Sequence, residues 1–258
     1  MIRPALHPTQ RFSSRVENYI RYRPRYPSAI IDLFRNECGL TQTAVIADIG
    51  SGTGILSELL LQNGNPVCGV EPNREMREAA ERLLKQHPAF RSVSGTAEAT
   101  TLASQSVDLI TCAQAFHWFD REKARIEFCR ILRPGGRVTL LWNDRDTASR
   151  PFFQAYEQLV KTFGTDYEAV HHKQIDADAI GAFFGANGCK QAVFPNQQVF
   201  DWDGLKGRLM SSSYAPEPGH PAHAPMLEAL RTLFLEHQTD GKVVFDYNTI
   251  VYYGKLVR

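Results

Sequence analysis

A glycine-rich stretch, residues 45–54 (VIADIGSGTG), constrains the fold of this chain more than any other part of its sequence. Its first half, Val45–Ile49, is apolar apart from one acidic residue and predicts a buried parallel strand. Three glycines follow at every second position and predict a tight turn, where a ligand meets the backbone without a Cβ in the way. Ile55–Leu61 then predicts a helix whose unpaired N–H groups face the same ligand. The stretch therefore predicts a binding site, although strand-to-helix turns of this kind also occur where nothing binds.

The composition is that of an ordinary soluble globular protein. With 258 residues, 43% of them hydrophobic and 22% charged, the chain has the size of one large domain or a domain with a cap. The net charge of +1 gives no global reason to expect nucleic acid or a membrane as a partner. The N-terminal sequence lacks the apolar core of a signal peptide, and the five cysteines show no CxxC spacing. We expect a cytoplasmic monomer or simple homo-oligomer with reduced thiols and no metal.

Between residues 44 and 142 the sequence alternates between strand and helix patterns, which predicts a parallel sheet covered by helices. The expected strands are residues 45–49, 67–70, 91–94, 107–112 and 138–142. Asn73 is the expected cap of a helix with a core-facing stripe, formed by Met76, Ala79, Ala80, Leu83 and Leu84. After Asn143 the alternation weakens. The expected helices there are 152–163, 175–187 (ended by Gly188), 203–213 and 225–237, and the expected strands are 192–200, 243–245 and 249–256.

Residues 1–42, which precede the first expected strand, include a short stretch rich in arginine and tyrosine. Helices are expected over 13–21 and 29–38, separated by Pro24 and Pro27. One interpretation of this segment is a solvated face on which arginines extend along apolar surface. The other is a lid over a ligand, in which tyrosine and arginine side chains grip an anionic group.

In an open parallel sheet, ligands bind beyond the carboxyl ends of the strands. Each motif in this chain follows such an end, and Glu71, 21 residues after Gly50, is placed to accept hydrogen bonds from a ribose diol. The glycine spacing is G-x-G-x-G, with Ile55 where a dinucleotide fingerprint requires its third glycine. This spacing favours a ligand that has a ribose but no pyrophosphate. Asp48 can orient the turn or meet a cationic amino group.

These motifs resemble those of the class I S-adenosylmethionine-dependent methyltransferases, of the methyltransferase type 11-like kind. The residues that carry the resemblance are 48–54, 70–72, 95–98, 107–110 and 130–136. Three further segments are similar to the small-molecule branch near the trans-aconitate methyltransferase-like proteins, namely 22–27, 114–119 and 247–256.

The resemblance implies an α/β fold with a Rossmann-like seven-stranded sheet, its last strand antiparallel, helices on both faces and a small helical cap. It implies an N-terminal helical lid (1–42), an S-adenosylmethionine-binding core (43–145) and a third region (146–258). That third region holds the helical cap segments and the final two strands, with 192–200 as the sixth and the stretch 243–256, which contains both final apolar runs, as the last.

The resemblance also implies roles for individual residues. Glu71 holds both ribose hydroxyls, Ala97 offers its N–H to the adenine ring, Glu98 meets the exocyclic amine, and Gln114 lies near the methionine group or the sulfonium. The expected cofactor-binding residues are Asp48, Gly50, Ser51, Gly52, Thr53, Gly54, Glu71, Pro72, Met76, Thr96, Ala97, Glu98 and Gln114.

Methyl transfer from a sulfonium is an in-line displacement, so the protein supplies mainly proximity and alignment. A protonated hydroxyl or amine acceptor needs a base, whereas a carboxylate needs none. His117 is the candidate base, and the alternative is that it packs or caps the helix after the fourth strand. The residues expected near the acceptor are Tyr22, Arg23, Tyr26, Trp118 and Asn143. Arg23 or Arg25 is the expected partner of a carboxylate.

Three functions agree with these observations. The first is a methyltransferase acting on a small molecule through a carboxylate or hydroxyl, with neither nucleic acid nor membrane as partner. The second is a non-catalytic protein that binds S-adenosylmethionine as a sensor or partner module. The third is a nicotinamide-dependent oxidoreductase, against which Ile55 counts.

Overall fold

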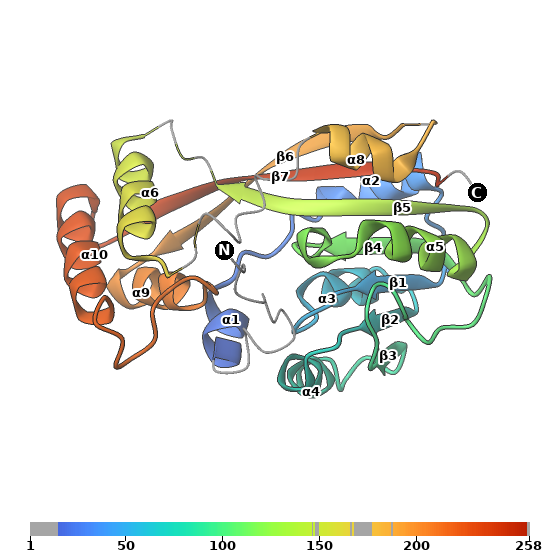
Figure 1. Cartoon of the computed structure of the whole chain (residues 1–258), viewed down its shortest axis with the longest axis horizontal. Helices are drawn as coiled ribbons and strands as arrows, with labels where there is room; N and C mark the ends of the chain where they lie inside the picture. The colour runs from blue at the N-terminus through green and yellow to red at the C-terminus, as the bar shows by residue number, and fades with distance from the viewer. Residues whose placement is uncertain are drawn as a thin grey trace, which may run out of the picture.

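A computed structural model describes residues 15–256 apart from 146, 148, 149, 166, 168–176 and 187. Its centre is one seven-stranded sheet in the order β3-β2-β1-β4-β5-β7-β6 (Figure 1). The strands are β1 (Ile46–Ile49), β2 (Val67–Val70), β3 (Phe90–Val93), β4 (Val107–Ala113), β5 (Leu132–Arg145), β6 (Lys190–Phe200) and β7 (Val243–Gly254). The first five are parallel, and β7 runs antiparallel to both of its neighbours. The predicted fold is thus confirmed, and the strand order reverses between β1 and β4.

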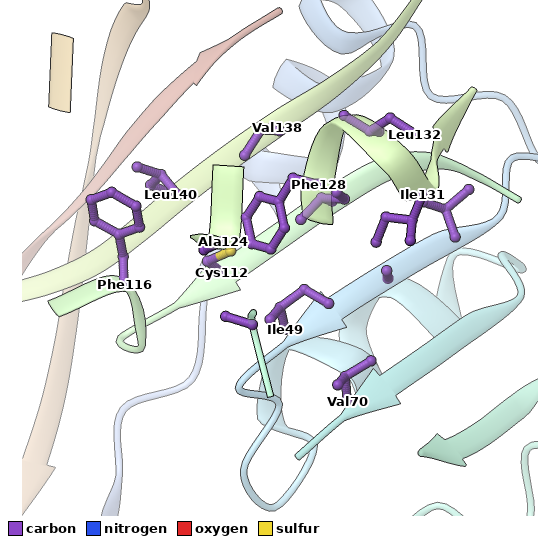
Figure 2. Packing of buried hydrophobic residues seen from close by; sticks show 14 of the residues in the cluster. Ile49, Val70, Cys112, Phe116, Ala124, Phe128, Ile131, Leu132, Val138 and Leu140 are labelled. Atoms are coloured by element: carbon purple, nitrogen blue, oxygen red, sulfur yellow. The ribbon is translucent and has the colours of Figure 1, made fainter. Parts of the chain in front are cut away.

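Helices cover both faces of the sheet. On one face, α5 (Arg121–Ile131) and α8 (Ala177–Phe184) pack on β1, β4 and β5. Figure 2 shows this layer, in which Ala124, Phe128 and Ile131 of α5 meet Cys112 and other strand side chains. On the opposite face lie α2 (Ala29–Cys38) and α3 (Ile55–Gln62). The strands between them are buried on both faces, which explains their almost uninterrupted apolar sequences.

A second apolar cluster lies at one end of the molecule, where α6 (Pro151–Phe163), α9 (Trp202–Met210) and α10 (His223–His237) gather (Figure 1). The long strands β5, β6 and β7 reach it, and Phe245 of β7 is fully buried there among aromatic rings. The short helix α1 (Val16–Tyr22) contacts both α9 and α4 (Arg74–Leu83). The cap and the core therefore share one continuous sheet.

The stretch expected as the final strand, 243–256, forms one strand, β7, because its alternate residues face the buried side without interruption. Other expected boundaries were wrong. Helix α8 ends at Phe184, because Gly185 takes a left-handed conformation (φ +79°) ahead of Gly188. Leu83 is 42% exposed, so the core-facing stripe of α4 ends with Leu84 instead. Residues 13, 14, 175, 176 and 187 of two expected helices lie outside the described residues.

None of the described helices combines the length and apolar character that crossing a bilayer requires.

Candidate functional site

The glycine turn lies at the carboxyl end of β1, next to the point where the strand order reverses. All three glycines have positive φ angles, +70° at Gly50, +57° at Gly52 and +84° at Gly54. A Cβ on Gly50 would lie 2.5 Å from the Cβ of Ala115, and one on Gly54 would lie 2.7 Å from Leu84 Cδ1. A Cβ on Gly52 would meet nothing within 4 Å. Gly50 and Gly54 therefore permit close packing, whereas Gly52 faces open space.

Two adjoining cavities open along the carboxyl ends of the parallel strands. We call the first the Glu71 cavity; its wall includes Gly52, Glu71, Pro72, Met76, Thr96, Ala97, Glu98 and Phe119. We call the second the arginine cavity; its wall includes Arg23, Tyr26, Asp48, Ser51, His117, Asn143, Arg145, Tyr167, Arg208, Tyr214 and Tyr247. Both cavities share Tyr19, Gly50, Ala113, Gln114 and Trp118. A ligand in one cavity therefore meets a ligand in the other at these shared residues.

Glu71 directly follows β2 and is only 8% exposed. One carboxylate oxygen, Oε2, accepts a hydrogen bond from the Gly52 amide at 2.9 Å, and Oε1 accepts one from the Asn73 amide at 2.8 Å. Burial raises the pKa of Glu71, and these two amide donors oppose the rise. The carboxylate thus fixes the glycine turn from one side and lines the Glu71 cavity from the other.

Asp48 lies on β1 and is 1% exposed. Its Oδ2 accepts a hydrogen bond from Ser57 Oγ at 2.7 Å, and its Oδ1 accepts one from Thr111 Oγ1 at 2.9 Å. Burial raises the pKa of Asp48 to about 6, and the two hydroxyl donors oppose the rise. Asp48 therefore ties β1 to α3 and β4, and it forms part of the wall of the arginine cavity.

Gln114 stands between the two cavities, one residue after β4. Its φ of +57° is unusual for a residue other than glycine. The backbone N–H donates to Leu141 O at 2.9 Å, and the side-chain Nε2 donates to Asn143 O at 3.4 Å. Its backbone is thereby held to β5 at the meeting point of the cavities.

His117 and Trp118 form the short 3₁₀ turn η2 (Phe116–Trp118), and both line the arginine cavity. Their ring centroids lie 4.7 Å apart. Asn143 also lines this cavity and is buried, and its Oδ1 accepts hydrogen bonds from Thr249 and Asn196. The arginine cavity thus contains the candidate base His117 and four of the five residues expected near the acceptor, namely Arg23, Tyr26, Trp118 and Asn143.

The N-terminal segment is held onto the carbonyl end of α9. Arg15 donates to Ser212 O at 2.7 Å and to Ala215 O at 2.7 Å, and Arg23 Nη2 donates to Ser211 O at 2.8 Å. Arginine is favourable there because carbonyls at a helix end lack partners within the helix. These contacts place Arg23 in the wall of the arginine cavity.

Four expected site residues lie outside both cavity walls. The Tyr22 ring packs against α9, where a Cβ on Gly207 would come within 2.0 Å of it. Arg25 points to the surface and pairs with Glu58 of α3. Thr53 and Gly54 lie behind the turn, where Thr53 is 2% exposed and Gly54 packs on Leu84.

Glu98 lines the Glu71 cavity, but its Oε1 already accepts a hydrogen bond from the Asp120 amide at 2.9 Å.

The sequence did not indicate Tyr19, Arg145, Tyr167, Arg208 or Tyr247, and in the run 211–214 it favoured a turn over hydroxyls contributed by the cap, yet these five residues and Tyr214 line the cavities. They come from α1, the end of β5, the α6–α8 connection, α9, the loop after α9 and β7. The Tyr/Arg-rich N-terminal segment was a signal for Tyr19. The others carry no local motif, because only the tertiary fold brings these segments together.

Comparisons with known proteins agree with this geometry. Residues 47–140 match the model of the methyltransferase domain family. An uncharacterised methyltransferase-like protein from Schizosaccharomyces pombe is 36% identical over 246 residues, which cover 93% of each chain. A second uncharacterised methyltransferase from that organism is 29% identical over 95% of this chain and 97% of its own.

Solved structures show the same fold. A protein of Anaeromyxobacter dehalogenans that has been assigned to the type II methyltransferases superposes with a TM-score of 0.68. It is 22% identical, and the match covers 92% of this chain and 99% of the other. The YcgJ protein from Bacillus subtilis superposes with a TM-score of 0.57 at 21% identity, over 90% and 99% of the two chains.

Proposed function

This chain belongs to the class I S-adenosylmethionine-dependent methyltransferases, and we propose that it methylates a small molecule bound in the arginine cavity. The observation that carries the proposal is the meeting of two cavities at Gly50 and Gln114. One cavity has features suited to a nucleoside, and the other has room and polar groups for an acceptor. We assign the adenosine part of the cofactor to the Glu71 cavity and its methionine part to the glycine turn and Asp48.

The residues of the Glu71 cavity fit a nucleoside. Each Glu71 oxygen accepts one backbone N–H and retains a lone pair for a ribose hydroxyl. Pro72, Met76 and Phe119 offer apolar surface to a purine ring. Gly52 leaves the approach open, because no atom lies where its Cβ would be. This combination supports a ribose against Glu71 and a base between the apolar side chains.

The bound cofactor supplies an electrophilic methyl group on a sulfonium. The remaining contribution of the protein is alignment of that methyl with the acceptor atom, together with exclusion of water. Tyr19 lines both cavities from α1, and Trp118 does so from η2, so these side chains flank the meeting point. We propose that they limit access of solvent to the reacting groups.

His117 is our candidate base for an acceptor that carries a hydroxyl proton. It lines the arginine cavity beside Trp118, on the same turn that follows Gln114. For a carboxylate acceptor no base is required, and His117 then only packs in the wall. A His117→Asn variant separates these roles: a loss of turnover at unchanged KM supports the base, and unchanged turnover contradicts it.

Ligand binding tests the proposed function first. We expect S-adenosylmethionine and S-adenosylhomocysteine to raise the Tm of the protein, and NAD to leave it unchanged. Glu71→Ala should weaken binding of S-adenosylhomocysteine by about tenfold or more, because a buried charge-assisted hydrogen bond to the ribose is lost. Glu78→Ala is the matched control, because Glu78 is exposed on α4 and pairs with Arg74.

The outcomes separate the alternatives. Stabilisation by NAD alone would favour the oxidoreductase and contradict the proposal. Binding of both sulfur ligands without any methylated product would favour a sensor. Unchanged affinity in Glu71→Ala would contradict our placement of the ribose.

A further inference from the structure

Two guanidinium groups of the arginine cavity have only neutral hydrogen-bond partners. Arg208 of α9 is 6% exposed. Its Nε donates to the Tyr247 hydroxyl at 3.0 Å, and its Nη1 donates to Ser212 Oγ at 3.2 Å. Among the described residues, no carboxylate forms an ion pair with Arg208. Within the part of the chain that the structure describes, its charge is therefore buried without an ion-pair partner.

Arg23 reaches the same cavity from the N-terminal segment. Its Nη2 donates to Ser211 O, its guanidinium lies 4.9 Å from the centre of the Tyr19 ring, and its buried Nε has no acceptor within the described structure. Burial lowers the pKa of Arg23, and the positive charge of Arg208 lowers it further. The guanidinium groups of Arg23 and Arg208 thus repel each other across this part of the cavity.

Arg145 provides the internal comparison, because it does have an acidic partner. Its Nη2 pairs with Glu157 and also donates to the Tyr167 hydroxyl at 3.2 Å. The Tyr214 hydroxyl lies in the field of all three arginines: burial raises its pKa, but the charges of Arg145, Arg208 and Arg23 lower it overall. Among the described residues, this end of the cavity thus has three arginines and one paired carboxylate, Glu157, and carries an excess of positive charge.

A buried cation without a partner is costly, and proteins retain one where a ligand supplies the counter-charge. We propose that Arg23 and Arg208 form a carboxylate-binding subsite, so that the acceptor of the proposed methyl transfer is a small organic acid. The inference rests on the proposed function for the reaction, but the subsite is defined by these two arginines alone. Guanidinium groups suit the subsite because their planar donors match the geometry of a carboxylate.

The surroundings favour a carboxylate over a phosphate. The helix end that faces this subsite is the carbonyl end of α9, whose Ser211 and Ser212 carbonyls already accept from Arg23 and Arg15. Phosphate sites in proteins are commonly built on the opposite, N–H end of a helix. A singly charged carboxylate offsets part of the excess positive charge, and these carbonyls repel it less than they repel a doubly charged phosphate.

The charged side chains of the arginine cavity also orient a bound acid. Asp48 is a buried acid beside the glycine turn and lines the same cavity as the two arginines. A ligand carboxylate is repelled by ionised Asp48 and attracted by Arg23 and Arg208. The anchored acid therefore points away from the turn, and the other end of the acceptor points to Gln114, where the cavities meet.

The anchored carboxylate is not the group that is methylated, because two guanidinium partners withdraw its electron pairs. A second group of the same molecule, a carboxylate or a hydroxyl, donates the oxygen pair that forms the new C–O bond. The C–S bond breaks, and its electron pair stays on sulfur. A hydroxyl loses its proton to a base or to solvent, whereas a carboxylate has none to lose. The product therefore keeps one free carboxylate.

The test uses the full chain saturated with S-adenosylhomocysteine, in buffer with physiological salt. Mono- and dicarboxylic acids of two to eight carbons are titrated by calorimetry, each beside its neutral amide. We expect at least one acid to bind and its amide to bind at least tenfold more weakly. Arg208→Gln and Arg23→Gln should each weaken binding of the acid by about tenfold or more, because each variant loses a charge-assisted hydrogen bond to the carboxylate.

Arg25→Gln is the matched control, because Arg25 lies two residues from Arg23 but pairs with Glu58 at the surface. It should change the affinity for the acid by less than twofold. Unchanged affinity for S-adenosylhomocysteine shows that each variant is folded, and a folded arginine variant that loses this affinity would assign that arginine to the cofactor's own carboxylate and contradict the inference. If Arg208→Gln fails to fold, Arg23→Gln carries the test, because within the described residues the Arg23 guanidinium donates one hydrogen bond, to Ser211 O.

Three results would overturn the inference: equal binding of acids and amides, full affinity in both arginine variants, or tighter binding of inorganic phosphate than of any acid. A wild-type protein that does not bind S-adenosylhomocysteine would instead overturn the proposed function. The two failures are therefore distinguishable.

Discussion

Asp48 and Glu71 mark the ends of neighbouring strands, but their carboxylates are held differently. Glu71 accepts hydrogen bonds from two backbone amides, whose N–H groups are fixed by the main chain. Asp48 accepts hydrogen bonds from two side-chain hydroxyls, which can rotate. Both positions were predicted from the sequence, because each is read from a local motif at a strand end. Thr53, Tyr22 and Arg25 were predicted by the same proximity to motifs, but their side chains point elsewhere.

We predict that the buried Asp48 carboxylate makes the stability of the protein depend on pH. Its pKa rises from an ordinary 3.8 to about 6 in the folded protein, so the folded state binds the proton more tightly than the unfolded state. Its contribution to stability is therefore present below pH 4 and is lost as pH rises to 6. The loss is on the order of 2–3 kcal/mol.

Urea unfolding of wild type and Asp48→Asn between pH 4 and 7 measures this contribution. Relative to the variant, wild type should lose free energy of unfolding as pH rises from 4 to 6 and then level off. Parallel curves across that range would show that Asp48 does not titrate there.

The strand–turn–helix unit formed by β1, the glycines and α3 was the most predictable element of the fold. Its apolar run and glycine spacing are local, and buried parallel strands tolerate little else. Strand β7 was also predicted, as the final strand over 243–256, although polar residues at 246 and 248 interrupt its apolar run; they alternate with buried residues. The end of α8 was set by a backbone conformation at Gly185 that the apolar pattern does not encode.

The turn offers a matched pair of substitutions. Gly52→Ala costs about 1–2 kcal/mol of stability for its left-handed backbone, and its methyl group enters the space where we place the cofactor. Gly54→Ala costs the same backbone strain and adds a clash with Leu84. We expect Gly54→Ala to lower the Tm more, and Gly52→Ala to lose more affinity for S-adenosylhomocysteine relative to its change in Tm. The reverse order would contradict our assignment of Gly52 to the cofactor.

At the scale of the whole molecule, the cap is built on the same sheet as the core. Strand β7 carries residues into the cap cluster, Arg145 at the end of β5 lies over the Tyr156 ring of α6, and α1 contacts both α9 and α4. The arginine cavity takes Arg23, Arg145 and Arg208 from three regions of the chain. No local pattern links these residues, and for this reason the acceptor side was largely unpredicted while the Glu71 side was largely predicted.

The most direct test of the central claim is methyl transfer itself. The purified protein is incubated with S-adenosylmethionine labelled on its methyl group and with a small-metabolite extract, and products are identified by mass. We predict a labelled small acid that gains one methyl group and keeps one free carboxylate, formed by wild type and Arg25→Gln and strongly reduced in Arg208→Gln. An extract without any labelled product, from a protein that binds S-adenosylmethionine, would contradict the account.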